Sequence, residues 1–123
     1  MEAEEELDLV FACVCEARTT SNCLEWRGKA SARVRADPHL KGLTPGGIRR
    51  MTVEHVLRVG KHAILQKREK RQEYSETSRF IYHIIVPCNL FRHGLFVELD
   101  FVEVDDQGYP VVDIVNAHEQ LKS

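Results

Sequence analysis

The chain has 123 residues, of which 43% are hydrophobic and 29% are charged, a composition typical of one globular domain rather than of a disordered chain. No apolar run approaches the roughly 20 residues of a membrane helix, and the N-terminus, "MEAEEELDL", is acidic where a signal peptide would be basic. We therefore expect a cytoplasmic protein with no membrane contact, forming a single domain over residues 1–123.

The formal net charge of −2 conceals a segregation of charge along the chain. From Arg27 to Arg71 there are 13 Lys and Arg residues and three acidic residues, whereas acidic residues predominate before and after this segment. Such a basic block indicates a surface for an anionic partner, nucleic acid first among them. The alternative is that the acidic flanks fold back and pair with the basic segment. The sequence leaves both interpretations open.

Helical periodicity dominates residues 1–60. Near the N-terminus, apolar residues recur at i, i+3, i+4 and i+7: Leu7, Val10, Phe11 and Val14. This spacing predicts a helix from Ala3 to about Arg18. After the break "TTSN", Ser21 or Asn22 would cap a second helix that continues to about Arg35.

A third helix is expected to begin in "GLTPGGIRRMT". Thr44 is a suitable N-cap and Pro45 a suitable first helical residue, and Gly60 has the character of a C-terminal stop. The two glycines give either a phosphate cradle, which Arg49 and Arg50 would strengthen, or only a close-packed joint between loop and helix. The P-loop spacing is absent, which favours the joint.

After Gly60 the period changes from 3.6 to 2. Four segments then have the character of strands: "HAILQKREKRQEY", "RFIYHIIV", "GLFVELDFVEV" and "VVDIVNAH". The signal "DDQGYP" joins the last two as a hairpin. We therefore expect an α+β fold in which N-terminal helices pack on one face of a four-stranded antiparallel sheet spanning residues 61–118, with the other face open.

The first of these strands is strongly basic. In an extended strand Arg68 and Lys70 share one face, and Lys67 and Arg71 share the other, with about 7 Å between neighbours on a face. Whichever face is open therefore presents two cations to successive phosphates of a nucleic acid. The alternative is a solvated edge strand that its Lys and Arg residues protect from aggregation.

Proton transfer would come from the far end of the sheet. His118 ends the last strand in "VNAHEQ", where it would project at the rim, and Glu98 is expected on the open face as a general base. Tyr82 would stack on a base. His83 lies inside an apolar strand, where a half-buried structural role is expected.

The cysteines give no metal site. They are four in number: Cys13, Cys15, Cys23 and Cys88. No second CxxC or matched pair of His residues completes a zinc set, so we expect packing residues with reduced thiols. No motif indicates a metal or an organic cofactor, and we expect none.

From Leu43 to His118 the arrangement resembles the small ribonuclease toxins of the barnase/EndoU/colicin/RelE superfamily. The resemblance rests on the helix "TPGGIRRMTVEHVLRVG", the basic strand "LQKREKRQEY" and the strands "FIYHIIV", "GLFVELDFV" and "VVDIVNAHE". It implies helices packed on a four-stranded antiparallel sheet. It also implies metal-independent cleavage of RNA on the open face of the sheet, because the 2′-hydroxyl of the RNA is the nucleophile.

The resemblance further implies roles for particular residues. Arg68 and Arg71 would hold the phosphate, His118 or Glu98 would transfer protons, and Tyr82 would orient or stack the substrate. Lys67, Lys70, Arg49 and Arg50 would add to phosphate binding.

A second hypothesis is a non-catalytic module that binds a protein or a nucleic acid. The partner would be RNA, an antitoxin-like or immunity-type protein, or a second copy of the chain. The connection "CNLFRHGLF", with Leu90 and Phe91 exposed, would suit such an interface. A His or carboxylate within hydrogen-bond reach of Arg68 or Arg71 on one open face would favour an enzyme.

Overall fold

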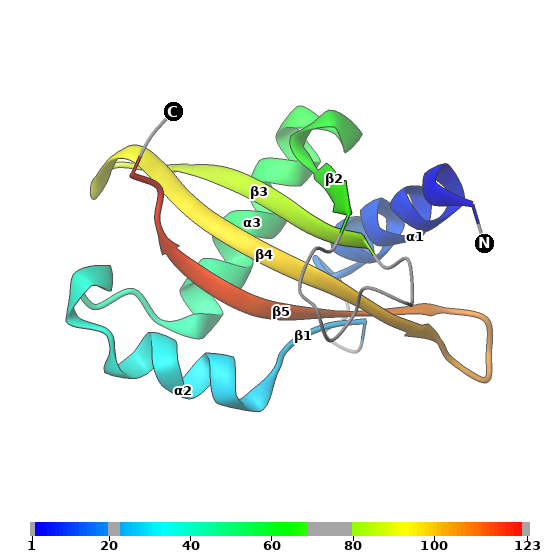
Figure 1. The fold of residues 1–123 in the computed structure, drawn as a ribbon, viewed down its shortest axis with the longest axis horizontal. Coiled ribbons are helices and arrows are strands. Elements are labelled where there is room, and N and C mark those ends of the chain that lie inside the picture. Colours follow the sequence, from blue (N-terminus) through cyan, green and yellow to red (C-terminus); the bar gives the residue numbers. More distant parts are fainter. Residues whose placement is uncertain (1, 20–22, 69–79, 122–123) are drawn as a thin grey trace.

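The computed structural model describes residues 2–19, 23–68 and 80–121. These residues form an α+β fold in which helices pack against a five-stranded mixed sheet (Figure 1). The helices are α1 (Ala3–Glu16), α2 (Gly28–Ala36) and α3 (Pro45–Val59), with the 3-10 helices η1 (Pro38–Leu40) and η2 (Lys61–Ala63). The strands are β1 (Leu24–Trp26), β2 (Leu65–Arg68), β3 (Phe80–Cys88), β4 (Phe91–Val104) and β5 (Pro110–Glu119). Within the described ranges, no helix has the length and apolar character that crossing a membrane requires.

The third helix begins and ends where its capping residues predict. The Thr44 hydroxyl accepts a hydrogen bond of 3.0 Å from the backbone N–H of Gly47, and Pro45 occupies the first turn. Gly60 follows the last helical residue with φ of 104°, a conformation that glycine adopts readily. The glycines of "TPGG" thus lie in a capped helix start, with Gly47 bonded within its own turn.

The expectation of a second helix from Asn22 is wrong in its first part. Leu24–Trp26 form β1, which pairs in parallel with Val112–Ile114 of β5, and α2 begins only at Gly28. Leu24 is completely buried and the exposed Glu25 follows it, which is the alternation of a strand. This fifth strand makes the sheet mixed rather than wholly antiparallel.

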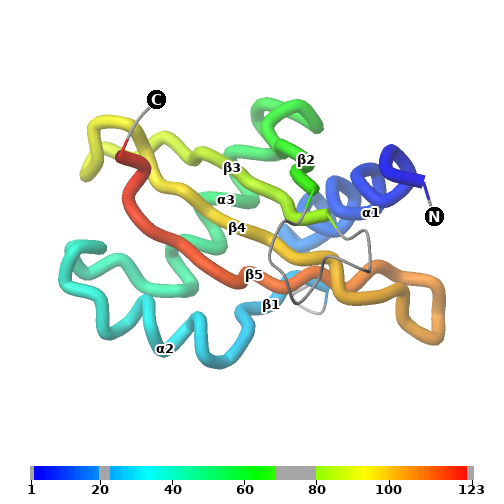
Figure 2. Tube along the Cα trace, viewed as in Figure 1, coloured from blue at the N-terminus to red at the C-terminus, as the bar shows by residue number. Residues whose placement is uncertain are grey.

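The strand order across the sheet is β1-β5-β4-β3-β2. All pairs except β1 with β5 are antiparallel, so the expected antiparallel meander is present as the β2–β5 part of the sheet. Beyond the strands that β3 covers, β4 and β5 continue as a two-stranded hairpin that extends past the rest of the sheet (Figure 2).

One face of the sheet packs against α1 and α3, which lie behind it in Figure 1. Cross-strand partners share a face, and the partners Tyr82, Leu99 and Ile114 are fully buried there. Leu95 and Val97 lie on the same face, as their alternation with Glu98 predicts. The opposite face, which we call the open face, is not covered by any helix of the described residues.

A β-bulge divides β5. Glu98 pairs with Asn116 and Leu99 pairs with Ile114, so Val115 is an extra residue without a partner in β4. The bulge changes the alternation along the strand. Asp113 and His118 consequently share the open face although an odd number of positions separates them.

We predict that Gly94→Ala destabilises the fold more than Gly108→Ala does. Both glycines have positive φ, of 88° and 87°, but a Cβ at Gly94 would lie 2.8 Å from the carbonyl oxygen of Val86, whereas a Cβ at Gly108 meets nothing within 4 Å. We expect losses of about 2–3 and about 1 kcal/mol in the free energy of unfolding, respectively. Urea denaturation measures both, and equal losses would show that the clash is absent.

Candidate functional site

The open face presents two rows of side chains fixed by strand register. His83 of β3 pairs with Glu98 of β4, which pairs with Asn116 of β5. In the adjacent row, Phe96 of β4 pairs with His118 of β5. Because residues two apart on one strand share a face, Phe96 and Glu98 lie on the same side. The register therefore brings two histidines and a carboxylate around one aromatic ring.

Ring contacts join these residues into what we call the imidazole cluster: His83, Phe96, Glu98 and His118. The Phe96 and His118 rings stack with centroids 4.6 Å apart and an interplanar angle of 19°. His83 meets the Phe96 ring edge to face, with centroids 4.7 Å apart. The two imidazoles therefore cannot lie farther apart than the sum of these distances, and Phe96 limits their orientations.

The hydrogen bond at His118 defines its tautomer. Nδ1 lies 2.9 Å from the backbone carbonyl oxygen of Glu119. A carbonyl oxygen only accepts, so Nδ1 carries the proton and donates it. In the neutral ring, Nε2 then has the lone pair, and the His118 side chain is exposed. This nitrogen has the properties that a general base requires.

His83 and Glu98 face each other across β3 and β4. The Nε2 atom of His83 lies 3.6 Å from Oε2 of Glu98, and the two side chains are 24% and 14% exposed. The pair is an ion pair when the imidazole is protonated. A carboxylate this close, in a partly desolvated place, favours the protonated imidazole that a general acid requires.

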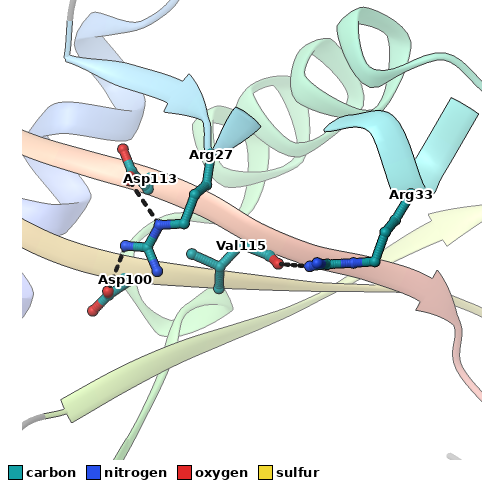
Figure 3. Close-up of polar contacts among 5 residues, drawn as sticks. All are labelled: Arg27, Arg33, Asp100, Asp113 and Val115. Carbon is teal, nitrogen blue, oxygen red and sulfur yellow. Dashed lines mark hydrogen bonds and ion pairs between the residues drawn. The ribbon is translucent and has the colours of Figure 1, made fainter. Parts of the chain in front are cut away.

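Arg27 crosses the open face from the end of β1 (Figure 3). Its guanidinium donates to Oδ2 of Asp100 at 2.8 Å and to Oδ2 of Asp113 at 3.1 Å. Asp100 and Asp113 are register partners on β4 and β5. Arg27 therefore neutralises two carboxylates that would otherwise repel each other across the strands, and it holds the start of α2 against the sheet.

Tyr82, expected on the open face, lies on the opposite face. Its ring is fully buried, and its hydroxyl donates to Oε1 of Glu6 at 2.7 Å while accepting from Nε2 of Gln66 at 3.1 Å. Burial, followed by the contact with Glu6, raises the pKa of Tyr82 well above its ordinary value. Tyr82 attaches α1 to the sheet, and its position excludes contact with a substrate on the open face.

The basic residues of β2 divide between the two faces. Lys67 pairs with Ile81, which precedes Tyr82, and therefore points to the open face. Arg68 pairs with Phe80 and lies over its ring at 4.9 Å from the centroid, on the same side as Tyr82. Arg68 is therefore on the other face from the imidazole cluster. Lys70 and Arg71 lie outside the described residues.

Arg49 and Arg50 belong to α3 and not to the open face. Arg49 donates to the backbone carbonyl oxygens of Leu24 at 2.9 Å and Ala17 at 3.3 Å, so it joins α3 to the start of β1 and the end of α1. Arg50 is exposed on the same helix. Both residues therefore lie with α3 on the side of the sheet opposite to the imidazole cluster.

The cysteines pack within the fold. Cys13 Sγ donates to the backbone oxygen of Cys23 at 2.9 Å, and Cys23 Sγ donates to that of Cys13 at 3.1 Å. Burial raises the pKa of the Cys13 thiol, and the neighbouring Cys23 raises it further, so Cys13 is a poor nucleophile. Across residues 2–19, 23–68 and 80–121, no group of three or more His, Cys, Asp or Glu residues could hold a metal ion.

Three residues of the site are not evident from the sequence: His83, Phe96 and Arg27. His83 alternates with Ile81 and Ile85 in a strand that is apolar on both faces, so the pattern does not show which face is open. Its pairing with Glu98 follows only from the register of β3 and β4. Arg27 reaches the open face because of β1, a strand that no periodicity in the sequence predicts.

Compared with protein-family models, with curated proteins and with solved structures, the chain matches none of them. The function must therefore be inferred from the geometry of the site.

We predict that Arg27→Met destabilises the fold and that Asp113→Asn partly restores it. Removing the cation leaves two carboxylates opposite each other on β4 and β5. Arg27 is 44% exposed, so solvent screens the pair, and we expect a loss of about 1 kcal/mol in the free energy of unfolding. A double-mutant cycle by urea denaturation measures the coupling, and additive effects of the two substitutions would contradict it.

Proposed function

We propose that the chain is an endoribonuclease of toxin type that cleaves RNA on the open face of its sheet without a metal or other cofactor. The observation that supports this is the imidazole cluster, in which two histidines with different hydrogen-bond partners flank Phe96. One imidazole has the tautomer of a base, and the other faces a carboxylate at 3.6 Å. Acid and base catalysis of a single displacement at phosphorus needs this combination.

The proposed reaction is an intramolecular transesterification. His118 Nε2 accepts the proton of the 2′-hydroxyl as the 2′ oxygen attacks the adjacent phosphorus. The bond from phosphorus to the 5′ oxygen breaks, and protonated His83 donates its proton to that oxygen. The products are a 2′,3′-cyclic phosphate and a 5′-hydroxyl. Glu98 acts as a positioning residue that stabilises the protonated form of His83.

Phosphate binding is assigned to cations that border the open face. Lys67 of β2 points to this face, on the side of the sheet away from β5. Arg71 and Lys70 keep this role as a proposal, whereas Arg68, Arg49 and Arg50 lie elsewhere in the fold and are less suited to it. The proposed activity implies RNA in the cytoplasm as substrate and an antitoxin-like protein as the inhibitor that covers the face.

A non-catalytic binding module is the second candidate. The hairpin of β4 and β5 exposes the apolar residues Val102, Val104 and Tyr109. Beside it, a cavity of about 460 Å³ is lined by Cys13, Tyr109 and Val111 among others. An exposed apolar arm next to a cavity suits a protein partner. Leu90 is exposed, as expected for such an interface, but Phe91 is only 5% exposed, so the connection between β3 and β4 presents less apolar surface than predicted.

We predict that His118→Ala and His83→Ala each lower kcat/KM on single-stranded RNA by roughly 100-fold to 10,000-fold, the usual contribution of one acid or base. A fluorogenic oligoribonucleotide measures the rate. His39→Ala is the matched control, because His39 is exposed in η1 and lies outside the cluster. Full activity of both cluster variants would rule out the assigned site.

The same assay tests the class of reaction. An oligonucleotide with a 2′-deoxyribose at every position should be inert, EDTA should leave the rate unchanged, and mass spectrometry should find the cyclic phosphate. Cleavage of the deoxy substrate, or complete inactivation by EDTA, would contradict the proposed chemistry. If no RNA is cleaved and the protein is folded, the binding module becomes the better interpretation.

The pH profile provides a separate prediction. The base must be neutral and the acid protonated, so kcat/KM should pass through a maximum as the pH rises. His118→Gln removes the base and should abolish the rise on the acidic side. His83→Gln removes the acid and should abolish the fall on the alkaline side. Unchanged limbs in both variants would show that other groups titrate.

A further inference from the structure

Three cations lie where the chain passes from β1 into α2, beside the β5 side of the open face. We call this group the basic rim: Arg27, Lys29 and Arg33. The sequence of α2, "GKASARVRA", contains no acidic residue. Arg27 crosses the open face with its side chain 44% exposed, and Lys29 lies exposed in the first turn of α2. The rim is therefore a cationic surface and not a buried network.

Contacts with β5 place the rim against the open face. Arg27 pairs with Asp113, and the Arg33 guanidinium donates to the backbone oxygen of Val115 at 3.2 Å (Figure 3). Val115 is the bulge residue, so its carbonyl is available at the edge of the ladder. Lys29 is four residues before Arg33 and therefore lies on the same flank of α2.

The rim leads along β5 toward the imidazole cluster. Arg27 is beside Asp113, Arg33 is beside Val115, and His118 follows near the end of the strand. At about 3.3 Å per residue, the α-carbons of Val115 and His118 are about 10 Å apart. This is a distance that one or two nucleotides of an extended strand can span.

Much of the hydrogen-bonding capacity of the rim remains for a ligand. An arginine has five N–H donors, and the hydrogen bond from Arg33 to Val115 occupies one nitrogen. Among the described residues, neither Lys29 nor Arg33 forms an ion pair with a carboxylate, whereas Arg27 is paired with Asp100 and Asp113. Lys29 and Arg33 are therefore suited to contacting phosphates, and Arg27 is suited to fixing the position of α2.

We propose that the basic rim binds the phosphate backbone of single-stranded RNA and directs it onto the imidazole cluster. This inference rests on the proposed function for its choice of RNA, and on charge complementarity for its choice of surface. A single strand is the fitting form, because the 2′-hydroxyl must align with the departing 5′ oxygen, and an A-form duplex holds it out of line. Backbone contacts from Lys29 and Arg33 carry no sequence preference.

The test measures binding separately from cleavage. Fluorescence anisotropy gives the Kd of a labelled 2′-O-methyl single-stranded oligonucleotide, whose blocked 2′ oxygen cannot react, at several salt concentrations. For Lys29→Ala combined with Arg33→Ala, we expect about a tenfold or larger rise in Kd at low salt. We also expect the slope of log Kd against log salt to fall by about 0.7 for each phosphate that the variant no longer neutralises.

The matched control combines Arg50→Ala with Arg58→Ala. It also removes two positive charges, but from exposed positions on α3, which packs on the opposite face of the sheet. The control should bind like the unaltered chain, and thermal melting should show that both double variants are folded. An unchanged Kd for the rim variant, an equal loss of affinity in both variants, or tighter binding of a duplex would each overturn the inference.

The two proposals fail in different ways. If the oligonucleotide binds with an affinity that depends on Lys29 and Arg33 but no RNA is cleaved, the ribonuclease proposal is wrong and the rim remains a binding surface. If RNA is cleaved through His118 and the rim variant has the Kd and kcat/KM of the unaltered chain, the rim proposal is wrong and the ribonuclease proposal remains.

Discussion

The parallel pairing of Leu24–Trp26 with Val112–Ile114 positions most of what borders the site. β1 adds only three residues to the sheet, but it ends where Arg27 begins its path across the open face. The pairing is reinforced at both ends. Val112 donates its backbone N–H to the carbonyl of Cys23 at 2.9 Å, and Arg27 donates its own to the carbonyl of Ile114 at 3.0 Å. Without this strand, α2 would have no defined position relative to β5.

The two faces of the sheet perform different tasks. The face under α1 and α3 is packed with aliphatic side chains, and Tyr82 there forms a polar link to α1 through Glu6 and Gln66. The open face carries the imidazoles, the carboxylates and Arg27. A rigid, well-packed layer beneath the ring of Phe96 is what allows the histidines above it to keep a defined geometry.

How much the sequence predicts depends on the range of the interactions involved. The caps of α3 and the alternation of Leu95, Val97 and Leu99 are local signals, and both are confirmed. β1 escapes prediction because its partner lies at the far end of the chain and three residues give no reliable period. The expectation for Tyr82 is wrong because its strand is apolar on both sides, which leaves the choice of face to the packing of α1.

The site residues follow the same division. Glu98 and His118 are predictable from alternation in their own strands, and both lie on the open face. Their catalytic roles remain predictions. The position of Arg68 depends on the register between β2 and β3, which the sequence does not specify, and the register places Arg68 over Phe80 instead. The pairing of His83 with Glu98 is hidden from the sequence for the same reason.

The bulge at Val115 has a consequence for how this protein can change during evolution. Because the side chains of a strand alternate with period 2, removing one residue at the bulge would turn one half of β5 over relative to the other. Either Asp113 or His118 would then point into the core. Substitutions along β5 can be absorbed one at a time, but a change of length there would separate the arginine bridge from the stacked imidazole. Relatives that keep this site should therefore vary in the letters of β5 and not in the number of residues between these two positions.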